Sequence, residues 1–210
     1  MKCFYPGLIL FLFFSVISSG CTLSFIHCSS KSATLCCIKK EFAKSFKNEI
    51  SNVDSLIRFD GYYYRSDYNT NGNYVVFYKN GLVGFGCGVN YLKDSLQPNK
   101  LSQYCSLWGT YSVSSDTIKV RCASKGTWMV PYDSFERWFL IKDKEHFETL
   151  VDKNICYPDH PGIPTMNYTA IFVLSSKLPT YEDCWLLKEK WFWKNENDWK
   201  RFTNSLKRQE

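Results

Sequence analysis

Residues 74–85, YVVFYKNGLVGF, contain two apolar, β-type runs on either side of Asn80-Gly81. An Asn-Gly pair between such runs is the strongest short-range signal for a β-hairpin, because a type I′ turn needs two residues that tolerate positive φ. Residues 74–78 and 82–85 are therefore predicted to be antiparallel neighbours. This hairpin opens the stretch from residue 74 to residue 147, on which the fold prediction rests.

Two further hairpins are predicted in the same stretch. Residues 108–113, WGTYSV, and residues 117–122, TIKVRC, flank the turn SSD. In the second arm apolar and charged residues alternate, which is the period of a strand with one buried face. Residues 137–141 and 146–150 flank the charged turn KDKE in the same way.

Sequential hairpins with short loops form a meander, and a meander that hides both of its edges closes into a barrel. With residues 59–64 before it and residues 168–174 after it, the chain supplies about eight strands, the number that closes a barrel with room for side chains or one small ligand. The predicted fold class is therefore mainly β, with a single antiparallel meander closing into a barrel over residues 56–175.

The start of the chain predicts the compartment. Residues 1–20 contain Lys2, an apolar run over residues 8–14 and then small residues, which is the organisation of a secretory signal peptide. The apolar run is too short to span a membrane. Cys21 directly follows the small residues, as in the lipobox of bacterial lipoproteins, where the cysteine becomes the lipidated first residue. The protein is predicted to be exported and lipid-anchored in the cell envelope; ordinary signal peptidase would cut at the same bond, so a secreted protein is the alternative.

Three segments flank or precede the barrel. Small polar residues over 21–37 are expected to form a tether after the lipidated cysteine. Apolar residues then recur at steps of three and four, which predicts an amphipathic helix over residues 38–55 that lies on a membrane surface or packs over the open end of the barrel. Residues 176–210 are predicted to be an aromatic helical segment, whose tryptophans contact a membrane or partner, or pack on the barrel wall.

The chain has 10 Cys. If Cys3 leaves with the signal peptide and Cys21 is lipidated, an even number remains for pairing in an oxidising compartment. The disulfide candidates are Cys156 with Cys184 and Cys87 with Cys105, since each pair would fasten a loop near the end of a strand. No Cys/His group has the spacing of zinc ligands, so neither a metal nor a cofactor is expected.

Charge and motifs narrow the function classes. The formal net charge is +6, and the basic residues are scattered along the chain, which disfavours nucleic acid as a partner. The sequence has no nucleophile elbow, no H-E-x-x-H and no glycine-rich phosphate loop. The stretch CYPDH over residues 156–160 combines a thiol, an acid and an imidazole, but an exported cysteine is expected in a disulfide. The chain is therefore predicted not to be an enzyme, and no catalytic residue is assigned.

A leader of the lipoprotein type, a basic spacer and a meander with WGTYSVSSDTIKV over residues 108–120 together resemble the lipocalin-like lipoproteins of Bacteroides-type bacteria. The resemblance spans residues 56–175, and in the first strand Gly61-Tyr62-Tyr63 stands where lipocalins carry G-x-W. It implies a lipocalin-like antiparallel barrel that binds a lipophilic ligand or an unknown partner, without catalysis.

Two functions follow from this pattern. In the first, the barrel binds a small apolar ligand among inward-facing aromatic residues, for which the candidates are Tyr62, Tyr64, Phe77, Phe85 and Trp138. In the second, the same aromatics fill the barrel, and the protein is an envelope interaction or structural lipoprotein that acts through its surface. Small residues at 84, 86 and 88 leave room for a ligand and favour the first function slightly. The expected partners are a membrane through the lipid anchor, a small lipophilic ligand or an envelope protein.

Overall fold

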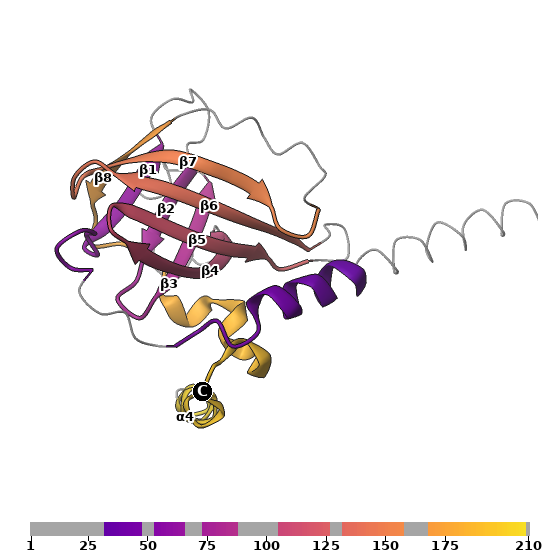
Figure 1. Cartoon of the computed structure of the whole chain (residues 1–210). Helices are drawn as coiled ribbons and strands as arrows, with labels where there is room; N and C mark the ends of the chain where they lie inside the picture. Colours follow the sequence, from indigo (N-terminus) through magenta and orange to yellow (C-terminus); the bar gives the residue numbers. More distant parts are fainter. Residues whose placement is uncertain are drawn as a thin grey trace, which may run out of the picture.

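A computed structural model describes residues 32–47, 53–65, 73–87, 105–126, 132–157 and 168–208. The predicted signal peptide and Cys21 lie outside these residues. Eight antiparallel strands pair in chain order and close into a barrel (Figure 1), which confirms the predicted fold class. The strands are β1 (Gly61–Arg65), β2 (Asn73–Phe77), β3 (Leu82–Cys87), β4 (Cys105–Ser114), β5 (Thr117–Ser124), β6 (Asp133–Ile141), β7 (His146–Asn154) and β8 (Thr169–Leu174).

The hairpin at Asn80-Gly81 forms with a different turn from the predicted one. Gly81 has φ 89°, whereas Asn80 is not among the residues with positive φ, so the turn is not type I′. Gly81 N donates to Tyr78 O and Tyr78 N donates to Leu82 O, which makes a three-residue loop with the left-handed glycine last. The Asn80 side chain accepts from Leu82 N at 3.1 Å and fixes the turn from the other side.

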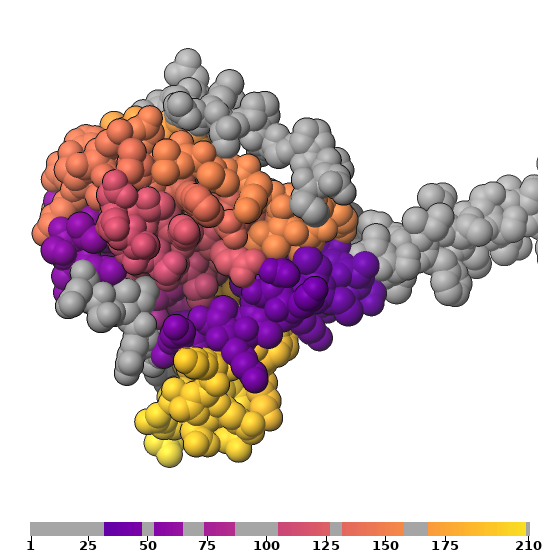
Figure 2. Space-filling model, viewed as in Figure 1, coloured from indigo at the N-terminus to yellow at the C-terminus, as the bar shows by residue number. Residues whose placement is uncertain are grey.

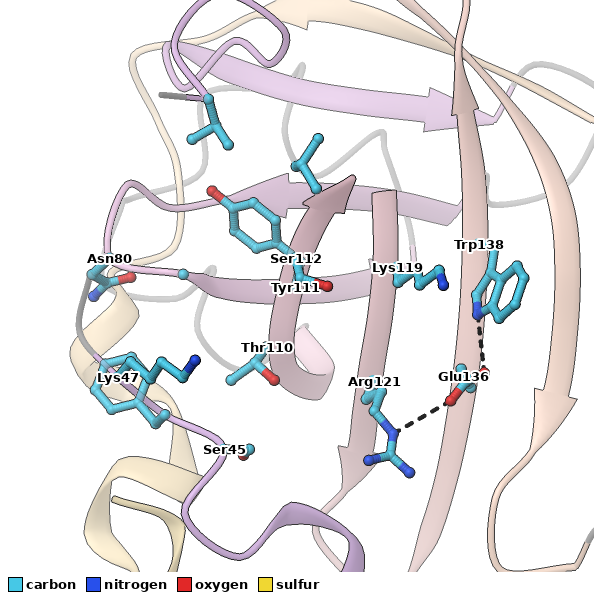
Figure 3. A pocket seen from close by; sticks show the side chains of 14 residues that line it. Ser45, Lys47, Asn80, Thr110, Tyr111, Ser112, Lys119, Arg121, Glu136 and Trp138 are labelled. Atoms are coloured by element: carbon cyan, nitrogen blue, oxygen red, sulfur yellow. Dashed lines mark hydrogen bonds and ion pairs between the residues drawn. The ribbon is translucent and has the colours of Figure 1, made fainter. Parts of the chain in front are cut away.

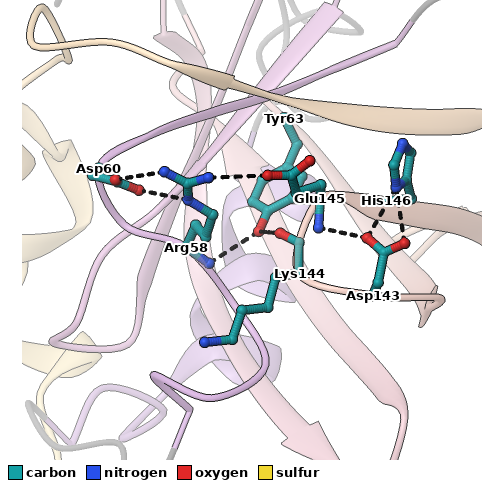
Figure 4. Close-up of polar contacts among 7 residues, drawn as sticks. All are labelled: Arg58, Asp60, Tyr63, Asp143, Lys144, Glu145 and His146. Atoms are coloured by element: carbon teal, nitrogen blue, oxygen red, sulfur yellow. Dashed lines mark hydrogen bonds and ion pairs between the residues drawn. The ribbon is translucent and has the colours of Figure 1, made fainter.

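Tight turns join the strands at one end of the barrel, and a polar network covers that end (Figure 4). Tyr63 Oη donates to Lys144 O (2.8 Å) and accepts from Arg58 N (3.0 Å). The Arg58 guanidinium pairs with both Asp60 and Glu145. Burial raises the pKa of Tyr63 to about 12, so its hydroxyl stays neutral and keeps both hydrogen bonds at physiological pH. β1 and the residues just before it are thereby fastened to the β6–β7 turn.

The barrel interior is filled by side chains from every strand. Phe77 packs edge-on against the rings of Tyr63, Tyr111 and Phe147, with centroid distances of 5.8, 4.9 and 6.0 Å. Such aromatic pairs add to the stabilisation from buried area. The buried members of this interior core are Ile57, Tyr63, Val75, Phe77, Val83, Phe85, Tyr111, Ile118, Val120, Cys122, Phe139, Phe147 and Ala170.

A second apolar core lies on the outside of the barrel, where the two terminal segments cover the wall (Figure 2, indigo and yellow). Glycines on β3 admit its large rings: a Cβ at Gly84 would lie 3.2 Å from Trp108, and one at Gly86 would lie 2.3 Å from Tyr74. These two glycines therefore make room outside the barrel, not for a ligand inside it. The strand residues of this outer core are Tyr62, Tyr74, Val76, Leu82, Cys105, Trp108 and Ala123.

The N-terminal segment differs from the prediction. Within the described residues the helix covers 32–42 rather than 38–55, so residues 32–37 are helical and not a tether. The helix ends before Lys44, whose φ is 56°, and residues 44–46 then run beside the C-terminal segment. Phe46 N donates to Phe192 O (3.1 Å), and Lys194 N donates to Phe46 O (3.0 Å). The apolar repeat continues past residue 42 because Phe46 packs in the outer core and Ile57 packs in the interior core, and the helix lies on the outer wall.

The C-terminal segment contains three 3₁₀ turns, η1 (Tyr181–Asp183), η2 (Trp185–Lys188) and η3 (Lys190–Phe192), and the helix α4 (Glu196–Leu206). Trp185 and Trp193 are buried in the outer core, so these two tryptophans pack on the barrel wall. Asn195 begins α4 by accepting from Asn197 N. Of the helices within the described ranges, none is long and apolar enough to cross a membrane.

One disulfide fastens the N-terminal helix to the end of β7. It joins Cys37 to Cys156 across 119 residues of sequence, so the predicted pair Cys156–Cys184 is wrong. Cys184 instead lies fully buried in the outer core as a thiol. The pair Cys87–Cys105 stays a prediction, because the side chain of Cys87 is outside the described part of the chain.

The disulfide predicts a specific loss of stability. Replacement by Cys156→Ser opens a very long covalent loop, and we expect a loss of about 2–5 kcal/mol in the free energy of unfolding. Urea unfolding under non-reducing conditions measures it. The matched control is Cys36→Ser, which changes the exposed neighbouring thiol and should leave the stability unchanged. Equal stability of the two variants would contradict the assignment.

Candidate functional site

The five residues predicted to bind a ligand do not share one site. Phe77 and Phe85 lie in the interior core. Tyr62 is buried in the outer core, and Tyr64 packs against that core from its edge. Trp138 lies on the outer face of β6, where it contacts Lys119. The sequence-based ligand site therefore divides between two faces of the barrel wall.

Among the residues that the structure describes, the barrel interior offers little free space. Its hollow, lined in part by Phe85, Arg137 and Tyr168, has a volume of ≈ 20 Å³. That volume is about enough for one water molecule, whereas ligand pockets occupy about 300–1,000 Å³. An eight-stranded barrel can hold either its own side chains or one small ligand, and here the described interior is occupied by side chains.

The interior also holds an ion pair that the sequence analysis missed. Arg137 Nε donates to Asp152 Oδ2 at 2.9 Å, and each side chain is only 13% exposed. The guanidinium carbon lies 5.0 Å from the Phe85 ring centre. Burial opposes the charge, but Cys122 and Asp152 keep the pKa of Arg137 above its usual value. In the sequence Arg137 stands two residues from both Phe135 and Phe139, which face inward on the same strand. The two-residue period of a strand was therefore sufficient to predict that Arg137 faces inward.

A larger groove lies on the outer wall, across β4, β5 and β6 (Figure 3). Its volume is ≈ 590 Å³, well inside the range of ligand-binding pockets. One side is formed by the irregular N-terminal segment and the floor by outward-facing strand residues. The polar and aromatic residues that line the groove include Lys47, Thr110, Ser112, Lys119, Arg121, Glu136 and Trp138.

Strand register places the floor residues in two cross-strand rows. Thr110 pairs with Arg121, which pairs with Glu136 on the next strand. In the same way Ser112 pairs with Lys119, which pairs with Trp138. Directly opposed residues on one face lie close enough to interact, so each row forms a continuous polar surface. The alternation in the second arm of the second hairpin was sufficient to place Lys119 and Arg121 on the wet face.

Glu136 is the residue of the first row that makes the most polar contacts with its neighbours. Its carboxylate accepts from Trp138 Nε1 (2.9 Å) and pairs with Lys153 Nζ (2.9 Å), and Arg121 Nε lies 3.4 Å away. Burial alone would raise the pKa of Glu136, but the hydrogen bonds from Lys153 and Trp138 and the nearby positive charges lower it. The charged carboxylate thus contributes stability above its ordinary pKa, and this contribution is lost as the pH falls through the lowered value. Arg121 also pairs with Glu41, which ties the helix to the groove.

The groove keeps a positive surplus. The acids Glu41 and Glu136 are matched by Arg121 and Lys153. Lys119 and Lys47 also contribute positive charge, and neither has an ion-pair partner within the described ranges. Lys119 Nζ lies 4.3 Å from the centre of the Trp138 ring, a cation–π contact that holds the ammonium group at the groove wall.

Unused hydrogen-bonding groups face the same space. The hydroxyls of Thr110 and Ser112 make no hydrogen bond to any other described residue, and Ser112 is exposed. A hydroxyl can both donate and accept, so a polar ligand can bond with either group. The groove therefore combines positive charge, free hydroxyls and adequate volume.

A second hollow of ≈ 340 Å³ adjoins the groove and lies beside α4. Phe46 and Asn80 line both spaces, so the two are continuous on the surface. The remaining walls come from the C-terminal segment, including Trp193, Arg201 and Phe202.

Two of the free thiols in the described part of the chain are fully buried. Burial raises the pKa of both Cys122 and Cys184 to about 12, so both remain protonated at neutral pH. Cys156, the thiol of the CYPDH stretch, is held in the disulfide. Among the described residues no group of His, Cys, Asp and Glu has the arrangement of a metal site.

Comparisons with protein-family models, with curated proteins and with solved structures found no match to this chain.

Proposed function

We propose that this chain is an exported β-barrel protein, anchored in the cell envelope through lipidated Cys21, that binds its ligand on the outer wall of the barrel. The observation that carries the proposal is the contrast in free volume: ≈ 20 Å³ in the interior and ≈ 590 Å³ in the groove across β4–β6. Free space in a protein is where a ligand binds without displacing packed side chains. The proposal shares the filled barrel and the use of the surface with the second of the two functions predicted from the sequence, and it keeps the small ligand of the first.

Export is supported by two independent features. The leader has the organisation of a signal peptide followed by Cys21. The disulfide Cys37–Cys156 is compatible with an oxidising compartment outside the cytoplasm. A lipid on Cys21 would place the barrel at a membrane surface, with the described N-terminal helix following at residues 32–42.

A lipid anchor on Cys21 predicts that the protein partitions into a detergent phase. In a detergent that separates on warming, the mature wild-type protein should enter the detergent phase, and Cys21→Ser should stay in the aqueous phase. Cys36→Ser is the matched control and should behave as wild type. A wild-type chain whose mature N-terminal peptide carries no acyl mass would contradict lipidation.

Groove binding predicts a variant that loses its ligand without losing its fold. Ser112 is exposed on β4, so Ser112→Trp should fill the groove while the strand accepts the aromatic side chain. In native mass spectrometry of protein purified without detergent from its export compartment, we expect a bound molecule on the wild type and none on Ser112→Trp.

The control reduces the interior hollow instead. Ala170→Val adds methyl groups at a residue that lines the interior, and it should keep the bound molecule. Loss of the molecule from Ala170→Val and its retention by Ser112→Trp would contradict the proposal and support ligand binding inside the barrel. A bare mass for the wild type would contradict binding of a small ligand at either place.

A further inference from the structure

We propose that the groove selects an acidic carbohydrate, a sugar that bears a phosphate or carboxylate group, and that Lys119 and Lys47 bind the acidic group. This inference rests on the proposed function and adds the chemical class of the ligand. The described structure carries it through three properties of one surface: its charge, its hydrogen-bonding groups and its size.

The positive charge of the groove predicts that the ligand is negatively charged. Of the cations in and beside the groove, Arg121 and Lys153 are engaged with Glu41 and Glu136. Lys119 is the cation on the floor that no carboxylate of the described chain neutralises. Lysine binds phosphate and carboxylate groups as a compact point charge, so an anion is the complement of this surface.

The hydrogen-bonding groups of the groove indicate which kind of molecule bears the acidic group. Thr110 and Ser112 present hydroxyls beside Lys119, and a hydroxyl can both donate and accept. A simple apolar anion would leave these groups without partners, whereas the hydroxyls of a sugar can bond with each of them.

Size favours a ligand larger than an inorganic ion. The groove volume of ≈ 590 Å³ is far larger than a lone phosphate needs. The Trp138 ring does not offer a bare stacking face, since Lys119 lies over it at 4.3 Å and Lys153 approaches to 5.8 Å. Recognition is therefore expected to depend on charge and hydroxyl contacts more than on stacking.

The test uses glucose 6-phosphate, glucuronic acid, glucose and inorganic phosphate, each titrated into the full mature chain and followed by NMR chemical shifts at low ionic strength. We expect both acidic sugars to bind, glucose and phosphate to bind at least about tenfold more weakly, and added salt to weaken the acidic sugars. Lys119→Gln should weaken their binding by about fivefold, the effect of one screened charge at close range.

Lys188→Gln, which removes an exposed charge on η2 away from the groove, is the matched control and should bind as wild type. Equal binding of glucose and glucose 6-phosphate, no effect of Lys119→Gln, or binding only to vesicles with anionic lipid headgroups would each overturn the inference. The inference can fail while the proposed function holds: if Ser112→Trp removes the native ligand while Lys119→Gln retains it fully, the groove binds a ligand of another class.

Discussion

The pairing of β1 with β8 is the constraint on which the rest of the structure depends. It runs from Gly61 opposite Leu174 to Arg65 opposite Ala170, and it turns an open meander into a closed barrel without free edges. The contact is close: a Cβ at Gly61 would lie 2.1 Å from the carbonyl oxygen of Val173. Closure fixes the diameter, and at eight strands the diameter leaves an interior that side chains can fill.

Once the interior is filled, the functional surface has to be sought on the outside. The outer wall carries two kinds of surface. Over β1–β4 it is apolar and covered by the two terminal segments, which are held there by the Cys37–Cys156 disulfide and by backbone hydrogen bonds at Phe46. Over β4–β6 it is polar and open, and the edge of the covering segments forms one side of the groove. The outer core thus shapes the candidate site as well as stabilising the fold.

Much of the fold was predictable from sequence, and the candidate site was not. Hairpin signals and the alternation over residues 117–122 placed the strands, because a barrel wall with one wet face repeats every two residues. The same rule failed on β1. Tyr62, Tyr63 and Tyr64 are all at least partly buried, since both faces of this strand are covered, and alternation carries no information when neither face is wet. Tyr63, which is inward, was therefore missed, while Tyr62 and Tyr64 were assigned to the interior.

Other errors came from interactions between distant parts of the chain. Cys37 and Cys156 are brought together by the packing of the N-terminal helix, and no local spacing encodes that contact. A register shift between Phe85 and Gly86 allows Cys105 to join the outer core, against the simple alternation along β4. The groove itself joins residues from the N-terminal segment with rows on three strands, so only the closed barrel reveals that Lys119 and Lys47 line one space.

The central claim is that the barrel is filled and that ligands bind outside it. The most direct measurement is a titration of the folded, detergent-free chain with the neutral apolar fluorophore N-phenyl-1-naphthylamine, which reports transfer into an apolar cavity. The account predicts no saturable increase in fluorescence for the wild type. Phe77→Ala, which removes a ring from the middle of the interior core, provides a positive control for an opened cavity. Saturable one-to-one binding by the wild type, displaced by a fatty acid, would contradict the account.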